Sequence, residues 1–296
     1  AACVRWCDGD YPRATGVGGQ MSVSAPHTGH DARSLYARIR SASWRASKAI
    51  RQHVLPRPLA QHVFVAGTNL LMDVLDASWD TQVFHETDPR AFERYEMRDL
   101  DTIHRLAANC PAPVFVIKAL CELDRIAALL DDFEPAKCLW VVRDWRDSAR
   151  SAIKSFGNFV PQWQRLAQGD ASDWRGRGMS PAIRRVLAKH YHADASEAEG
   201  AAIMWVYRNS LFFEQQLEND PRVRCVFYED LVRYPEREVE ALFGFLGLRD
   251  FSKAVAARIH ARSLRYREPS DISLEVCRLC DDLLARFRTL SGASTS

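Results

Sequence analysis

Short, continuous apolar runs that alternate with amphipathic helical patterns constrain the fold of this chain most strongly. The runs cover residues 63–66, 114–117, 138–142 and 223–227. After the first run, for example, Leu71, Val74 and Leu75 recur at helical spacing. Parallel strands that are buried on both faces are typically continuous apolar runs, and helices connect them. The sequence therefore predicts an α/β fold with a mostly parallel central sheet and helices on both faces.

The composition is that of an ordinary globular protein. The chain has 296 residues, of which 47% are hydrophobic and 26% charged, and its net charge of +2 gives no global attraction to nucleic acid. No apolar stretch reaches the ~18 to 20 residues that a membrane span needs. We expect a domain over residues 59–290, preceded by a tail and a basic helical segment over 1–58. The eight scattered cysteines indicate a reducing compartment, and we predict a cytoplasmic protein without a metal.

The N-terminal segment is unusually basic. Residues 1–20 resemble translated upstream sequence or a disordered tail, and Met21 is a plausible start. No acidic residue occurs over 32–72, and the pattern predicts a basic helix that ends at Pro56, with one face formed by Leu35, Ile39, Ala46 and Ile50. We expect a solvated helix packed on the edge of the domain. Two alternatives stay open: peripheral contact of segment 33–57 with an anionic membrane surface, or a transit peptide from Met21.

Two further segments need an interpretation. Cys277 and Cys280 form a lone CxxC on the apolar side of a helical pattern, which favours core packing over metal binding. Over residues 158–199 the strand–helix alternation stops and gives way to a polar stretch that contains glycine and tryptophan. Long excursions of this kind serve as lids or acceptor-binding insertions, or are mobile.

A candidate phosphate site lies at the end of the third apolar run. Arg143 comes directly after that run, and Ser151 lies in the helical pattern that follows. In an open parallel sheet, ligands bind beyond the carboxyl ends of the strands. A guanidinium at a strand end and a hydroxyl on the next helix can bind one phosphate together.

Segment 143–151 resembles the part of the sulfotransferase family that binds the 3′-phosphate of 3′-phosphoadenosine 5′-phosphosulfate (PAPS), with Arg143, Asp147 and Ser151 at the matching positions. Segment 227–235, with 245–248, is similar to the family's Tyr-Glu-Asp-Leu and Phe-Leu-Gly blocks, and 116–119 is similar to its strand that ends in a catalytic lysine. These motifs occur in family order over about residues 62–248. The resemblance implies a P-loop NTPase-like sulfotransferase fold. It also implies transfer of a sulfuryl group from PAPS to a hydroxyl or amine of a small-molecule or carbohydrate acceptor.

The resemblance also implies roles for individual residues. Lys118 would be the catalytic cation and Tyr228 would lie near the adenine. Cytosolic members use a histidine as the catalytic base, and this chain has Leu120 at that position. Heparan-modifying members use an acid as the base, and this chain has Asp73 at that position. Asp73 is therefore a candidate base, although a helix-start acid is an equal interpretation, and His85 is an alternative base. Two guesses extend the site: Trp79 stacking near Tyr228, and Arg265 and Arg267 against the 3′-phosphate.

The chain departs from the family in the loop after the first strand. Family members have Gly-x-Pro-Arg/Lys-Ser-Gly-Thr there, and this chain is about five residues shorter and lacks the basic residue. Gly67, Thr68 and Asn69 keep the helix-start position and could offer amide donors and a hydroxyl to the cofactor. We expect the fold and nucleotide binding to survive and transfer to be lost. The alternative function is thus a catalytically impaired nucleotide-binding protein. A nucleoside-kinase-like enzyme fits less well, because no Gly-x-x-x-x-Gly-Lys-Ser/Thr stretch occurs.

Overall fold

The computed structural model describes residues 31–170, 173–249, 253–256, 259 and 271–292. Its centre is a five-stranded sheet in which every pairing is parallel, in the order β2-β5-β1-β6-β7. The strands are β1 (Gln61–Ala66), β2 (Thr81–Phe84), β5 (Val114–Lys118), β6 (Ala136–Val142) and β7 (Val223–Phe227). A separate antiparallel pair consists of β3 (Phe92–Glu93) and β4 (Glu96–Met97). The predicted mostly parallel sheet is confirmed.

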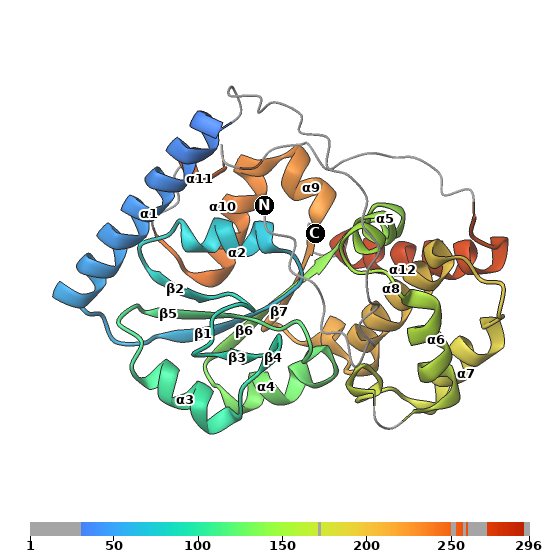
Figure 1. Cartoon of the computed structure of the whole chain (residues 1–296). Helices are drawn as coiled ribbons and strands as arrows, with labels where there is room; N and C mark the ends of the chain where they lie inside the picture. Colours follow the sequence, from blue (N-terminus) through green and yellow to red (C-terminus); the bar gives the residue numbers. More distant parts are fainter. Residues whose placement is uncertain (1–30, 171–172, 250–252, 257–258, 260–270, 293–296) are drawn as a thin grey trace, which may run out of the picture.

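Helices cover both faces of the sheet (Figure 1). Val63 and Val65 of β1 point into one core, and Phe64 and Ala66 point into the other, because side chains alternate along a strand. The first core is closed by α2 (Asn69–Asp76), α9 (Tyr228–Arg233), α10 (Pro235–Leu246) and α11 (Lys253–Ala256). The second is closed by α3 (Leu100–Ala108), α4 (Ile126–Asp132) and the helices described next. Short 3-10 helices are η1 (Leu123–Arg125), η2 (Trp174–Gly176) and η3 (Leu217–Asn219).

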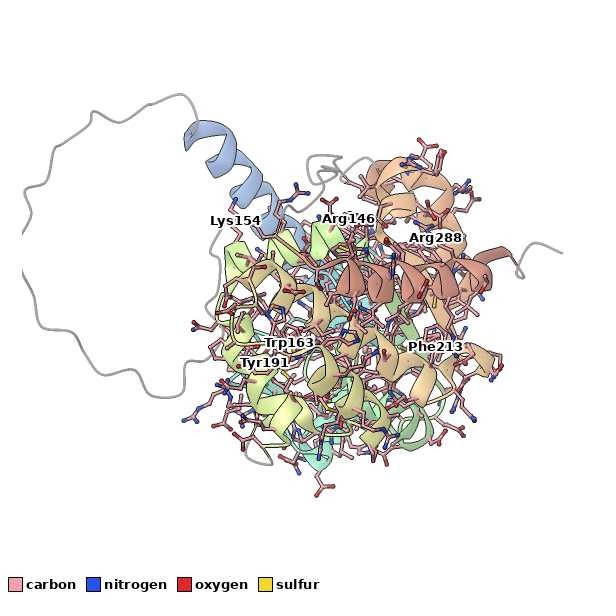
Figure 2. The ribbon with its side chains drawn as sticks, turned by 90° about the vertical axis from the view of Figure 1, so that its right-hand side faces the viewer. Arg146, Lys154, Trp163, Tyr191, Phe213 and Arg288 are labelled. Carbon is pink, nitrogen blue, oxygen red and sulfur yellow. The ribbon has the colours of Figure 1, made fainter. Side chains whose placement is uncertain are left out.

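The interrupted stretch 158–199 is mostly a packed helical layer without strands, and its role as a lid or an acceptor-binding insertion stays a prediction. Its helices are α6 (Phe159–Gln168), α7 (Pro181–His190) and the start of α8 (Glu197–Glu214), and they gather with α5 (Trp145–Ser155) on the right of Figure 1. Trp163 is fully buried, donates a hydrogen bond to Leu187 O (2.8 Å) and lies against Tyr191 (Figure 2). A side chain at Gly200 would come within 2.9 Å of Phe159, so glycine lets α6 and α8 approach closely.

The C-terminal helix α12 (Leu274–Gly292) covers α8 (Figure 2). Cys280 is buried on it, with its thiol near Ala202 O, and Cys277 packs half-buried beside the same core. The core-packing interpretation of the CxxC is therefore confirmed. Ion pairs of its Asp281 with Arg146 (3.0 Å) and of its Arg288 with Asp230 (2.7 Å) fix the helix from outside.

The basic segment forms α1 (Asp31–Val54), and it contacts the edge of the domain as expected. Among its described side chains, the face that it turns inward is polar. Lys48 and Gln52 are buried against the segment around Asp76 and Thr81, whereas Ile50 is 64% exposed. The reason is chemical: this part of the domain offers carbonyl and carboxylate oxygens, which need donors. The side chains of residues 31–42 lie outside the described ones, and the boundary at 58/59 stays a prediction.

Candidate functional site

The candidate site lies where the order of the sheet changes direction. The chain runs from central β1 out to β2, returns through β5 and continues to β6 on the other side of β1. Such a switch point opens a crevice beyond the carboxyl ends of the strands. A cavity of about 500 Å³ lies there. Seven of the predicted site residues line it: Gly67, Thr68, Asn69, Lys118, Arg143, Ser151 and Tyr228.

Gly67 and Thr68 alone connect β1 to α2. Gly67 has a φ of +154°, and a Cβ atom on it would lie 2.4 Å from the Cβ of Val141, so only glycine fits where β1 passes β6. Thr68 caps α2 by accepting a hydrogen bond from the N–H of Leu70 (3.2 Å). The tight connection predicted from the sequence is therefore compatible with the fold.

Lys118 ends β5 inside the cavity and has a carboxylate partner. It is 4% exposed, and its ammonium donates hydrogen bonds to Asn69 Oδ1 and to Glu86 Oε1, the latter at 2.7 Å. Burial lowers the pKa of Lys118, although Glu86 opposes this shift. The other carboxylate oxygen of Glu86 is buried without a hydrogen-bond partner among the described residues. An ionisable pair of this kind, placed in a cavity, is a candidate for proton transfer.

Glu86 was not predicted from the sequence as a site residue. It follows β2, a four-residue edge strand that contains Gln82 and that the apolar runs did not reveal. The strand pairs in register with β5, so that Phe84 lies beside Ile117 and the residues after both strands converge. A prediction of β2 would have placed the residues after Phe84, Glu86 among them, near the end of β5.

Arg143 directly follows β6, and its side chain contacts Tyr228, which directly follows β7. Its guanidinium lies 4.6 Å from the ring centroid of Tyr228, a cation–π geometry, and its Nη2 is 4.0 Å from Asp147 Oδ2. Asp147 is buried in α5 and also pairs with Arg150. Ser151 lies one turn further along α5 and lines the same cavity. The structure thus brings the predicted phosphate ligands to one wall.

Asp73 lies elsewhere, which corrects its expected orientation toward the start of α2. Leu71, Met72, Val74 and Leu75 form the buried face of α2, so Asp73 is exposed. It shares a separate hollow with His85, the alternative base, and with Arg45, Asp88 and Arg90.

The two guesses about more distant residues have different outcomes. Trp79 packs on Trp44 (4.1 Å between ring centroids) and on Arg51, and it does not line the cavity with Tyr228. Arg265 and Arg267 lie outside the described residues.

The helical layer contributes residues that no motif revealed. Arg208 of α8 donates to Leu120 O (2.6 Å), and Arg175 donates to Asp173 (2.8 Å). A signal for Arg208 exists, because it is a charged residue inside an almost wholly buried helix. Aromatic and other apolar side chains complete this wall: Tyr95, Leu120, Phe156, Phe159, Met204 and Trp205.

No protein-family profile and no curated protein sequence matches the chain. Among solved structures, it is similar to a sulfotransferase from Alicyclobacillus acidocaldarius, at 19% identity and a TM-score of 0.48, over 79% of this chain and 96% of that one. It is also similar to the sulfotransferase domain from the curacin biosynthetic pathway, at 14% identity and a TM-score of 0.46, over 77% of this chain and 98% of that one. A third similar structure is mouse sulfotransferase SULT7A1 complexed with PAP, at 16% identity and a TM-score of 0.41, over 80% of this chain and 87% of that one. These likenesses are distant.

Two features are absent from the described part of the chain. Within it, no group of three or more His, Cys, Asp or Glu side chains is arranged to hold a metal ion. None of its helices combines the length and apolar character needed to span a membrane.

Proposed function

We propose that this chain is a sulfotransferase that binds PAPS and transfers its sulfuryl group to a hydroxyl or amine of a small-molecule or carbohydrate acceptor. One observation carries the proposal: the residues that the sequence motifs single out come from separate strand ends and line a single cavity. The pairing of Arg143 with Tyr228 and the position of Ser151 support a 3′-phosphate next to an adenine. Gly67, Thr68 and Asn69 would face the 5′ end of the nucleotide.

Sulfuryl transfer sets clear demands on the protein. The acceptor oxygen or nitrogen forms a bond to sulfur while the bond from sulfur to the bridging oxygen breaks, and the acceptor proton passes to a base. Lys118 would offset the charge that builds on the leaving phosphate. We assign the base to Glu86 instead of Asp73, because Glu86 lines the cavity and has a carboxylate oxygen without a partner among the described residues.

A second function is nucleotide binding without transfer. The observation that favours it is the connection after β1, which consists of Gly67 and Thr68 and holds no basic side chain. Both functions require the 3′-phosphate site, and only the first requires turnover.

Calorimetry with adenosine 3′,5′-bisphosphate tests the shared requirement. We expect Arg143→Ala to weaken binding by about 1.5 to 3 kcal/mol, because a charge-assisted hydrogen bond is lost. Adenosine 5′-monophosphate, which lacks the 3′-phosphate, should bind the parent and the variant almost equally. Arg105→Ala, on the exposed side of α3, is the matched control and should change neither affinity. Equal affinity of Arg143→Ala and the parent for the bisphosphate would show that the proposal is wrong.

A further inference from the structure

The basic side chains that line the cavity differ in whether a carboxylate neutralises them. Most have a partner: Lys118 with Glu86 (2.7 Å), Arg175 with Asp173 (2.8 Å) and Arg143 with Asp147 (4.0 Å). Arg208 has none within the part of the chain that the structure describes, and its hydrogen bond goes to the carbonyl of Leu120. Arg208 therefore brings to the cavity a positive charge that no carboxylate of the described residues pairs with at ion-pair distance.

That charge is close to the end of β5. Arg208 Nη2 donates to Leu120 O (2.6 Å), and Leu120 follows Lys118 by two positions. The positive charge of Arg208 also acts on the ammonium of Lys118. Lys118 in turn pairs in register with Val65 of β1, just before Gly67. Arg208 of α8, Lys118 and the short connection after β1 thus line the same cavity.

The nearby carboxylate of Glu122 does not serve as the missing partner. Its oxygens accept hydrogen bonds from the backbone N–H groups of Met97 (2.8 Å) and Cys121 (3.1 Å). Arg208 is only partly buried, yet this burial disfavours the charged form and lowers the pKa of its guanidinium. A guanidinium has several N–H donors, and a single carbonyl leaves most of them available to a ligand.

We propose that Arg208 binds the anionic group at the 5′ end of the nucleotide and supplies, from α8, the positive charge that the connection after β1 lacks. This inference rests on the proposed function. The ligand is the phosphosulfate of the donor or the 5′-phosphate of the product. A partly buried guanidinium without a carboxylate partner has an energetic cost, and an anion bound between it and Lys118 would lower that cost.

The test compares two nucleotides that differ only at the 5′ end: adenosine 3′,5′-bisphosphate and adenosine 3′-monophosphate. Calorimetry would use the parent, Arg208→Gln, Arg208→Lys and the surface control Arg105→Gln. We expect Arg208→Gln to bind the bisphosphate about 10- to 100-fold more weakly, as for the loss of a charge-assisted hydrogen bond, and the monophosphate as the parent does. Arg208→Lys, which keeps the charge but not the planar fork, should fall between them.

Equal weakening of both nucleotides by Arg208→Gln, or of neither, would overturn the inference. A second measurement does not depend on the nucleotide: the rise in melting temperature caused by inorganic sulfate, relative to chloride at equal ionic strength. This rise should shrink in Arg208→Gln and Arg208→Lys but not in Arg105→Gln, and an undiminished rise in the Arg208 variants would also contradict the inference. Failure of the Arg143→Ala test would remove the proposed function, yet a sulfate effect that requires Arg208 would remain.

Discussion

Lys48 of α1 and Lys118 of β5 are each 4% exposed, but their surroundings differ. Lys48 donates to Asp76 O (2.7 Å), Asp76 Oδ1 (3.1 Å) and Thr81 Oγ1 (3.1 Å), which provides an acceptor for each of its N–H groups. Among the described residues, Lys118 donates to Asn69 and Glu86 only, and it lines the cavity. One N–H group of Lys118 is thus left for a ligand. Burial alone does not distinguish a structural lysine from a functional one, whereas the supply of acceptors does.

The largest expected effect concerns the short connection after β1, which lines the same cavity as Lys118. Inserting Tyr-Pro-Arg-Ser-Gly between Gly67 and Thr68 should raise sulfate transfer by on the order of 10²-fold or more, because one preorganised donor contributes ~10²- to 10³-fold. Release of sulfate from PAPS provides the measurement where no acceptor is known. Rapid transfer by the chain without the insertion would show that the short connection is sufficient.

The inserted protein also separates the two lysines. Lys118→Met should lower its turnover by on the order of 10²-fold, whereas Lys48→Met should leave the turnover of folded protein unchanged. The carboxylates form a second matched pair: Glu86→Gln should slow transfer by ~10²- to 10⁴-fold, and Asp73→Asn should not. Loss of turnover in Asp73→Asn with normal turnover in Glu86→Gln would reverse the assignment of the base.

The features predicted correctly from the sequence are those that local pattern determines. The apolar runs gave β1, β5, β6 and β7, and their ends placed Lys118 and Arg143. The carboxyl ends of parallel strands meet at one edge of the sheet, so residues at these ends lie near one another once the strands are known.

The features that were missed or wrong depend on tertiary partners. Glu86 follows an edge strand too short to be recognised, and Arg208 comes from a helix outside the motifs. The polar buried face of α1 was not predicted, because amphipathicity indicates which face is apolar, not whether the neighbouring surface is apolar. Here that surface consists largely of the oxygens around Asp76 and Thr81.

A smaller effect, on stability alone, tests the structural role of Lys48. Lys48→Met should reduce the free energy of unfolding by about 1 to 3 kcal/mol, because it leaves the acceptors of Asp76 and Thr81 without their donor. Urea unfolding measures this loss. A Lys48→Met protein as stable as the parent would indicate that α1 contributes little to the folded domain.

The smallest expected effect is at Ile50, two positions from Lys48 and on the opposite side of α1. Ile50 and Val54 are 64% and 69% exposed, so replacing Ile50 removes no buried contact. Ile50→Gln should therefore change the free energy of unfolding by no more than about 0.5 kcal/mol, as is usual for surface substitutions. A large-to-small or polar substitution in a core typically costs more than about 1 kcal/mol. A loss of that size in Ile50→Gln, together with an unaffected Lys48→Met, would mean that α1 packs through its apolar face. The two variants in the same urea titration thus determine which face of α1 the domain covers.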